Sequence, residues 1–290
     1  MKQILVISGK GGTGKTTFTA SLAQLQKKVV VCDCDVDAPD LHMLLNPKKQ
    51  EKIEFKGQQM AYIDRNLCRN CGKCSMLCQF QAIGKGFVVD PVRCEGCGVC
   101  SWNCSWNAIT MKERIAGEYY ISKIKNGYMV HALLNPGESN SGKLVSAVKK
   151  KGREIAEQKG FDKILIDGAP GIACPVIASL SGVDLAVIVT EPTLSGFHDM
   201  ERVHRLCEHF KLKTNAVVNK FDLNTAETGH IEKYCREKGI EVIGKIPFSE
   251  AITEALMKGK TVLESKKSNP VVNILHEINR KVWNSTEEKI

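Results

Sequence analysis

A glycine-rich segment follows directly after a short apolar run near the start of the chain, and this order limits the possible folds more than any other feature. The apolar run is QILVI, residues 3–7, and the segment is SGKGGTGKTT, residues 8–17. The segment fits the pattern G-x-x-x-x-G-K-[ST], in which glycines let backbone N–H groups face phosphate oxygens. A helix is expected from Lys15, because Phe18 and Leu22 stand at helical spacing. The sequence therefore predicts a strand, a phosphate-binding loop and a helix, in that order.

The loop residues have distinct expected tasks. Lys15 is expected to reach the β- and γ-phosphates of a nucleotide, and the Thr16 hydroxyl is expected to bind Mg²⁺. The N-terminus of the helix adds a partial positive charge at the same place. An ordinary glycine turn is the alternative, and the flanking strand and helix disfavour it. The residues expected to contact the nucleotide in this segment are Gly9, Gly11, Gly12, Thr13, Gly14, Lys15, Thr16 and Thr17.

Most of the chain alternates strand-like and helix-like segments. Apolar runs such as VVVCD, KILID and LAVIVT are typical of strands buried on both faces, and helical stretches lie between them. This alternation predicts an α/β domain with a mostly parallel sheet and helices on both faces. The pattern breaks between residues 51 and 135. We therefore expect one domain made of residues 1–50 and 136–290, with residues 51–135 inserted in a loop.

The flanks of the insertion are expected to form hairpin strands. They read KIEFKGQQMAYI and EYYISKIKNGYMV. Gly57–Gln58 and Asn126–Gly127 are the candidate turns, because glycine accepts the backbone conformations that tight turns need.

The insertion contains one cysteine pattern twice. Each copy reads C-x₂-C-x₂-C-x₃-C, and the copies are offset by 26 residues. This is the spacing of bacterial ferredoxins with two [4Fe–4S] clusters, in which the fourth cysteine of each run ligates the other cluster. Residues 60–115 are thus expected to form a small α+β ferredoxin-like domain. The expected ligands are Cys68, Cys71, Cys74 and Cys104 for the first cluster, and Cys94, Cys97, Cys100 and Cys78 for the second.

Two observations on this module leave alternatives open. Gln79 and Ser105 follow the fourth cysteines, where such ferredoxins usually have proline, so the local turns differ while all ligands remain. Two Cys₄ zinc sites are the main alternative to clusters. Residues 60–115 carry seven Lys and Arg against four Asp and Glu, which favours an acidic protein partner, or else is a chance surface balance.

The phosphate-binding loop resembles the deviant Walker A loop of the MinD/ParA family, which includes Mrp-type cluster-carrier ATPases and the nitrogenase iron protein. The resemblance rests on Lys10 in KGGTGKT, five residues before Lys15. In that family the extra lysine reaches the phosphates bound by a partner subunit. The resemblance therefore implies a dimer, with itself or with a related ATPase, in which Lys10 acts like an arginine finger. A solvated loop lysine is the alternative.

Two further segments match this family in the expected order. VVVCDCDVDAP resembles its switch I segment. This match implies that Asp35 positions the attacking water and that Asp33 assists near the metal. FDKILIDGAPG resembles its Walker B strand, which implies that Asp167 holds Mg²⁺.

Two later segments of the chain resemble the parts of the family that contact the base of the nucleotide. AVVNK and IPFSEAI imply that Asn219, Pro247 and Phe248 contact adenine. The matching segments cover residues 1 to about 48 and about 136 to 290. They are specific for the family and not for the task of one member.

These features together predict a Mg²⁺-dependent, ATP-binding and ATP-hydrolysing dimer with two [4Fe–4S] clusters. Closure driven by the nucleotide would be coupled to the clusters, for electron transfer to a protein partner. One alternative is an assembly or carrier ATPase for an iron–sulfur or other metal cofactor. A second alternative is a MinD/ParA-like spatial switch on membrane or DNA.

Bulk properties bear on where such a protein works. The formal net charge is +9, with Lys and Arg scattered among acidic residues, so nucleic acid and membrane are not expected as partners. There is no apolar run long enough for a spanning helix, and the first residues lack the pattern of a signal peptide. The sequence predicts a cytoplasmic protein.

Overall fold

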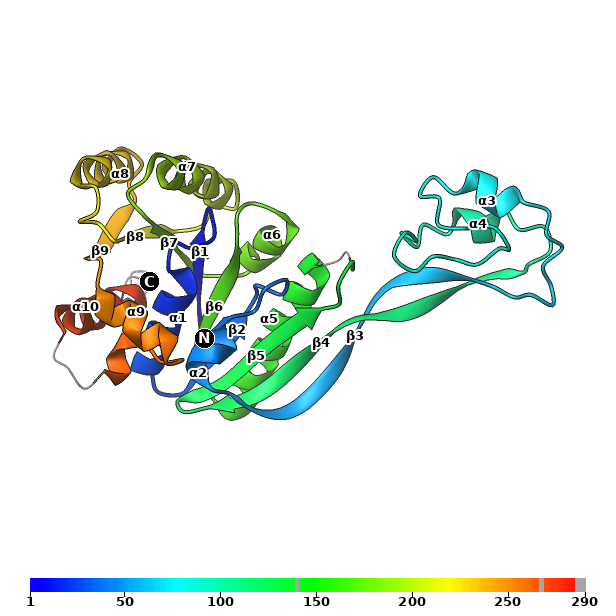
Figure 1. Cartoon of the computed structure of the whole chain (residues 1–290). Coiled ribbons are helices and arrows are strands. Elements are labelled where there is room, and N and C mark those ends of the chain that lie inside the picture. The colour runs from blue at the N-terminus through cyan, green and yellow to red at the C-terminus, as the bar shows by residue number, and fades with distance from the viewer. Residues whose placement is uncertain (139–140, 266–268, 285–290) are drawn as a thin grey trace. The chain divides into compact units, whose positions relative to one another are not determined.

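The computed structural model describes residues 1–138, 141–265 and 269–284. In this part of the chain the strands form one nine-stranded sheet in the order β3-β4-β5-β2-β6-β1-β7-β8-β9 (Figure 1). The strands are β1 (Lys2–Ser8), β2 (Val29–Asp33), β3 (Lys48–Ile63), β4 (Ile109–Ile124), β5 (Gly127–Leu134), β6 (Lys163–Pro170), β7 (Leu185–Thr190), β8 (Thr214–Asn219) and β9 (Glu241–Ile246).

Helices connect most of these strands. The helices are α1 (Lys15–Leu25), α2 (Leu41–Leu45), α3 (Lys73–Leu77), α4 (Val99–Trp102), α5 (Ser141–Lys159), α6 (Cys174–Leu180), α7 (Leu194–His209), α8 (Thr225–Glu237), α9 (Glu250–Met257), α10 (Pro270–Asn284) and the 3₁₀ turn η1 (Val262–Glu264). The expected phosphate-binding loop lies between β1 and α1, and α1 begins at Lys15 as predicted.

The sheet from β5 to β9 is parallel, which confirms the α/β prediction. Each neighbouring pair in this part of the sheet is parallel, with β1 between β6 and β7. The side chains of residues 4–7 in β1 are fully buried. A strand covered on both faces must be apolar along its whole length, and this explains the unbroken run at the start of the sequence.

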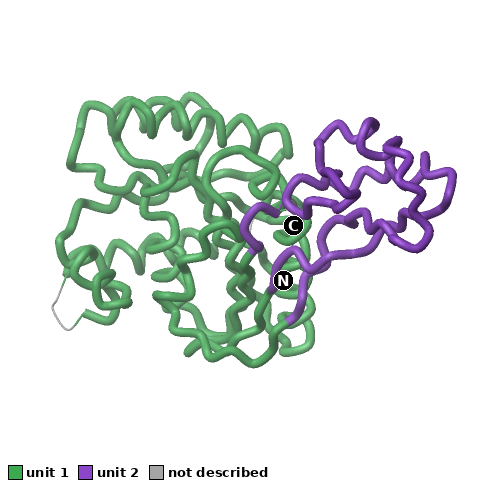
Figure 2. The backbone as a smooth tube through the Cα atoms, turned by 45° about the vertical axis from the view of Figure 1, so that its right-hand side comes forward, with its two compact units in different colours: residues 1–52, 119–133, 141–290 green, residues 53–118, 134–140 purple. Residues whose placement is uncertain are grey.

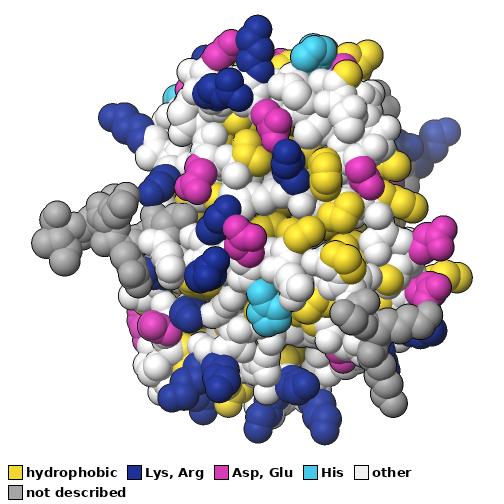
Figure 3. Space-filling model, turned by 90° about the vertical axis from the view of Figure 1, so that its left-hand side faces the viewer, with side chains coloured by type: hydrophobic (Ala, Val, Ile, Leu, Met, Phe, Trp, Pro, Cys, Tyr) yellow, Lys and Arg dark blue, Asp and Glu magenta, His cyan; other side chains and the backbone are white. Residues whose placement is uncertain are grey.

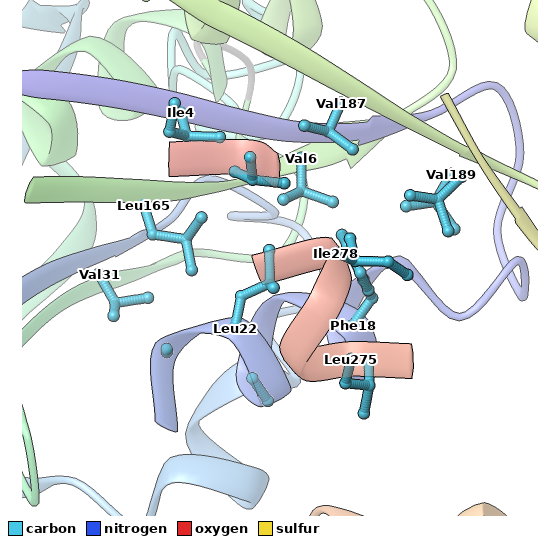
Figure 4. Packing of buried hydrophobic residues seen from close by; sticks show 14 of the residues in the cluster. Ile4, Val6, Phe18, Leu22, Val31, Leu165, Val187, Val189, Leu275 and Ile278 are labelled. Carbon is cyan, nitrogen blue, oxygen red and sulfur yellow. The ribbon is translucent and has the colours of Figure 1, made fainter. Parts of the chain in front are cut away.

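Helices α1 and α10 bury their apolar sides in the same core. Phe18 and Leu22 of α1 lie in one cluster with Ile278 of α10 and with residues of β1, β6 and β7 (Figure 4). A Cβ atom on Gly244 of β9 would stand 2.3 Å from the Ile278 side chain, so α10 packs closely on the sheet. The apolar stripe of the last described helix is therefore core.

The chain divides into two compact units (Figure 2). The larger unit comprises residues 1–52, 119–133 and 141–290, and the smaller unit comprises residues 53–118 and 134–140. Residues 119–133 thus group with the larger unit rather than with the expected insertion. The physical reason is that β5 pairs in parallel with β2, with His131 opposite Asp33.

One of the two predicted turns is wrong. Gly57 and Gln58 lie inside β3, which continues without a turn from Lys48 to Ile63. A Cβ atom on Gly57 would stand 2.3 Å from the Ala116 Cβ atom, so this glycine permits close approach of β4 and makes no turn. The other turn falls at Lys125 and Asn126, directly before β5.

The smaller unit repeats its backbone contacts with the offset of the cysteine pattern. The Asp64 N–H donates to the Ala108 carbonyl at 2.8 Å, and the Asp90 N–H donates to the Ala82 carbonyl at 2.7 Å. Each half therefore pairs with the other. The helices α3 and α4 begin after Gly72 and Gly98, whose φ angles are 79° and 77°. The duplication seen in the sequence is thus a duplication of local structure.

Candidate nucleotide site and cysteine cavities

The loop between β1 and α1 needs its glycines. Gly12 and Gly14 have φ angles of 83° and 88°, in the region that L side chains rarely adopt. A Cβ atom on Gly14 would also stand 2.4 Å from the Asn219 amide nitrogen. This amide group donates a hydrogen bond of 2.8 Å to the Thr13 carbonyl. The end of β8 thereby holds the loop in shape.

Asp167 is the centre of a buried hydrogen-bond cluster. Its carboxylate is 2.9 Å from the Lys15 Nζ atom, and the pair is almost fully buried. Thr16 donates to the same carboxylate at 2.9 Å, and so does Thr19. The structure therefore brings together the lysine, the hydroxyl and the carboxylate that the sequence assigned to phosphate and magnesium.

Asp33 lies beside Asp167 because β2 and β6 are neighbours in register. Asp33 is fully buried, and its Oδ1 atom accepts a hydrogen bond of 3.2 Å from the Asp35 N–H. Its Oδ2 atom is buried and has no partner among the described residues. A buried carboxylate oxygen without a partner is costly unless a ligand completes its surroundings.

The charges at this edge of the sheet are tightly linked. Burial and, next, the Asp167 charge raise the pKa of Asp33 well above its usual value. Burial also raises the pKa of Asp35, against the attraction of Lys15. Burial alone would lower the pKa of Lys15, but the charge and hydrogen bond of Asp167 outweigh it, so the pKa is raised. Lys15 is the cation beside these three carboxylates, so a bound cation such as Mg²⁺ would find favourable electrostatics here.

A cavity of about 620 Å³ opens beside these groups. Its lining includes the loop, Asp35, Asn219, and the Pro247 and Phe248 pair that follows β9. Phe248 remains 48% exposed, so its ring is available to a flat ligand. The size fits a nucleotide. Donors on the loop, a buried lysine and the orphaned Asp33 oxygen suit phosphates with Mg²⁺. Cavity residues of the loop are Lys10, Gly11, Gly12, Thr13, Gly14, Lys15, Thr16 and Thr17.

Lys10 does not point freely into solvent. Its Nζ atom is 2.7 Å from the Glu191 carboxylate, at the end of β7. Its Nζ atom also donates to the Thr193 and Ser195 hydroxyls, at 3.2 and 3.0 Å. Glu191 pairs in addition with Lys220, at 3.1 Å. Burial tends to raise the pKa of Glu191, but the hydrogen bonds from Lys10 and Lys220 outweigh it, so the pKa is lowered. The carboxylate is thus held charged.

The contacts of Gly9 and Asn219 add to the expected roles. A Cβ atom on Gly9 would clash with the Asp199 backbone of α7 at 2.4 Å, so this glycine serves packing as well as the loop turn. Asn219 lines the cavity and also braces the loop. Sequence analysis missed Glu191 and Thr19. Thr19 lies one helical turn after Lys15, a spacing that could have indicated it, whereas Glu191 stands 181 residues after Lys10 and gave no local signal.

Each set of four cysteines lines its own small cavity in the smaller unit. Cys68, Cys71, Cys74 and Cys104 line one, which we call cavity A. Cys78, Cys94, Cys97 and Cys100 line the other, cavity B. The fourth cysteine of each run lies with the first three of the other run. The structure therefore groups the eight cysteines into the two sets expected from the sequence.

In each half of the repeat, a backbone N–H group donates to the sulfur of the fourth cysteine. The Ala82 N–H donates to the Cys78 sulfur and the Ala108 N–H to the Cys104 sulfur, both at 3.3 Å. Such donors stabilise thiolate sulfur. Burial raises the pKa of the Cys74 thiol. Among the described residues, no three His, Cys, Asp or Glu side chains gather closely enough to hold a single metal ion.

Comparisons with known proteins identify the family of the nucleotide-binding fold. The family model of the CobQ/CobB/MinD/ParA nucleotide binding domain matches residues 4–262. An uncharacterized protein of Methanocaldococcus jannaschii is 38% identical over 226 residues, which are 77% of this chain and 79% of that protein. A second uncharacterized protein of that organism is 28% identical, over 98% of both chains.

A solved structure shares the fold. MinD of Pyrococcus horikoshii, determined as a complex with Mg-ADP, gives a TM-score of 0.60 at 17% identity. The match covers 100% of this chain and 99% of that chain.

Within the described ranges, no helix is both long and apolar enough to cross a lipid bilayer.

Proposed function

Because the chain belongs to the CobQ/CobB/MinD/ParA nucleotide-binding family, we propose that it hydrolyses Mg-ATP as a dimer and couples its nucleotide state to two [4Fe–4S] clusters. The clusters would exchange electrons with a protein partner. The observation that carries the cluster half is the division of eight cysteines between two cavities, four to each. The nucleotide half rests on the family and on the groups around Asp167.

The buried contacts suggest what the larger unit does when nucleotide binds. Lys15 is paired with Asp167 here, and Thr16 donates to the same carboxylate. Phosphates would draw the Lys15 ammonium away from Asp167, because they carry more negative charge. Asp167 and Thr16 would then face Mg²⁺, which neutralises charge on the phosphate oxygens when bound. The ion pair thus holds the Lys15 ammonium at Asp167 until phosphates replace this carboxylate as its partner.

Two carboxylates remain for the attacking water. Asp35 lines the cavity and is only partly buried, so it can accept a hydrogen bond from a water at the γ-phosphate. Asp33 is fully buried, and its free Oδ2 atom faces no described partner. We assign Asp35 to orienting the water and Asp33 to supporting the magnesium shell. Lys10 would supply positive charge to the site of a partner subunit.

In the smaller unit, the protein would contribute ligands and a protected setting. The two sets of cysteines would hold the clusters as thiolates, and the N–H groups of Ala82 and Ala108 would stabilise one sulfur in each set. The bound clusters supply one-electron chemistry. The strands β3 and β4 each contain residues of both units, so the backbone continues directly from the nucleotide-binding sheet to the cysteine repeat.

Metal and sulfide analysis of anaerobically purified protein tests the cluster half. Two clusters require about eight iron and eight sulfide per chain, whereas two Cys₄ zinc sites require about two zinc and no sulfide. The zinc result would refute the cluster proposal without touching the ATPase proposal.

Lys10→Ala tests the nucleotide half. We expect the variant to bind Mg-ATP with little change and to lose most of its hydrolysis, because the lysine acts on the phosphates of the partner subunit. Lys15→Ala is the matched comparison, since removing the lysine of the loop itself should weaken binding as well. Unchanged turnover in Lys10→Ala would refute the role across the dimer.

Two other functions of the same machinery remain as candidates. A carrier ATPase for a metal cofactor would transfer its clusters to an apo-protein. A spatial switch of the MinD type would bind membrane or DNA when ATP is present. On the face drawn in Figure 3, Lys and Arg side chains gather along the lower edge and are interspersed with Asp and Glu elsewhere. ATP-dependent pelleting with anionic vesicles or DNA would favour the switch.

A further inference from the structure

The two cysteine cavities carry the same ligands but opposite charges. Cavity A is lined by Arg69 and Lys73. With the offset of 26 residues, the equivalent positions are Glu95 and Val99, and both line cavity B. The described lining of cavity B includes no lysine or arginine. The repeat therefore preserved its cysteines and diverged in charge at the same two positions.

The cations of cavity A are available for a partner. Arg69 and Lys73 are exposed, and neither forms an ion pair with a described residue. Two other cations of the smaller unit are paired: Arg93 with Asp90 at 3.6 Å and Lys56 with Glu113 at 2.9 Å. Unpaired charges on one side of a small module create a local positive potential that attracts acidic molecules.

An exposed aromatic ring stands beside these cations. Trp106 lines cavity A, is 52% exposed, and lies 5.8 Å from the Arg69 guanidinium group. Tryptophan and arginine are the side chains that contribute most often to the centre of protein interfaces. Cys71 of the same cavity is itself exposed, so a protein seated here would approach the ligands of cavity A. We call Arg69, Cys71, Lys73 and Trp106 the basic mouth.

We propose that the basic mouth is the docking surface for an acidic one-electron carrier protein, and that the cluster of cavity A exchanges electrons with it. This inference rests on the proposed function, because it requires clusters. The exchange moves one electron, and one centre is oxidised as the other is reduced, with no bond made or broken. We infer an acidic carrier from charge complementarity, because the basic mouth contains two cations and an aromatic ring. The negative charge of Glu95 at cavity B would repel the same carrier.

The repeat supplies a matched pair of variants. Lys73 and Val99 are the first residues of α3 and α4, where a glutamate is favourable for the helix. Lys73→Glu reverses a charge at the basic mouth, and Val99→Glu adds the same side chain at the equivalent position of cavity B. Iron and sulfide contents of both variants show whether the clusters are retained, so a folding defect is separated from a docking defect.

The experiment measures binding and electron transfer with an acidic plant-type ferredoxin as the probe. Binding between the two oxidised proteins is measured by calorimetry, and stopped-flow absorbance gives the second-order rate of electron transfer. At about 20 mM salt we expect Lys73→Glu to weaken binding and slow transfer by about tenfold, and about 0.5 M salt to abolish the difference. Val99→Glu should change either quantity by less than about twofold.

The outcomes separate the two levels of the account. Equal effects of Lys73→Glu and Val99→Glu, or binding that does not depend on salt, would overturn the docking surface while the clusters stand. A wild-type protein that lacks iron and sulfide would overturn the proposed function itself, and the docking inference with it. Preference for a basic carrier such as cytochrome c would also overturn the charge argument.

Discussion

Glu191 forms an ion pair with Lys10 of the same subunit, whereas we propose that Lys10 acts on the nucleotide bound by the partner subunit. The Lys10 Nζ atom is 2.7 Å from Glu191, and the two side chains are 27% and 16% exposed. Lys10 must leave this contact before it can reach another subunit. Glu191→Gln removes the charge and keeps the shape, so we expect it to favour the dimer that forms with Mg-ATP.

The size of the effect follows from the geometry of the pair. A partly exposed ion pair contributes about 1 kcal/mol. A symmetric dimer releases one such lysine from each subunit, so the variant gains about 2 kcal/mol in dimerisation. Because 1.4 kcal/mol is a factor of ten, the dissociation constant should fall by about 30-fold. Screening by salt reduces this gain, which is a further mark of an ion pair.

Sedimentation velocity with Mg²⁺ and a hydrolysis-resistant ATP analogue measures the dimer directly. Lys220→Met is the control, because it removes the second cation on Glu191, at 3.1 Å, and leaves the Lys10 contact in place. The control should not tighten the dimer. A Glu191→Gln protein that dimerises more weakly than wild type would refute the reasoning, since Glu191 would then act for the dimer and not against it.

Three shorter predictions concern other parts of the chain. Cys78→Ser should damage the cluster of cavity B alone, as seen by loss of one of two EPR signals; loss of the cavity A signal would contradict the cysteine grouping. Gly14→Ala should weaken ATP binding at least about tenfold in calorimetry, because φ is 88° and Asn219 occupies the space of a Cβ atom; unchanged affinity would count against the loop geometry. Burial, His42 and Lys49 lower the pKa of His131 to about 4. The unfolded chain therefore binds the His131 proton first as pH falls below about 6.5, and this group should cost the folded state about 1–2 kcal/mol between pH 7.5 and 5. The raised pKa values of Asp33 and Asp35 act in the opposite sense, so the loss is measured in urea titrations as the difference between wild type and His131→Leu; equal pH dependence of the two proteins would contradict it.

Local patterns in the sequence were sufficient for the loop and for the cysteines. The strand, glycine loop and helix around Lys15 form from neighbouring residues, so their spacing alone indicates the structure. The grouping of the cysteines was also accessible, because the ferredoxin spacing assigns the fourth cysteine of each run to the other set. The loop is fixed by neighbouring residues, whereas the cysteine grouping was accessible only through the known spacing rule.

Features set by distant contacts were not accessible. Gly57 looked like a turn, yet it lies inside β3, since its missing side chain makes room for Ala116. The strand β5 looked like part of the insertion, and its pairing with β2 places it in the larger unit. The Lys10–Glu191 contact joins residues far apart in sequence. Sheet pairing and ion pairs of this kind depend on the whole fold.

The central claim is that the nucleotide state and the clusters are coupled. The most direct test is a potentiometric EPR titration of the anaerobically prepared protein, carried out with and without Mg-ATP. The account predicts that Mg-ATP shifts the reduction potential or the line shape of at least one cluster, and that Lys10→Ala suppresses the shift. Two intact clusters with identical titrations in both conditions would contradict the coupling.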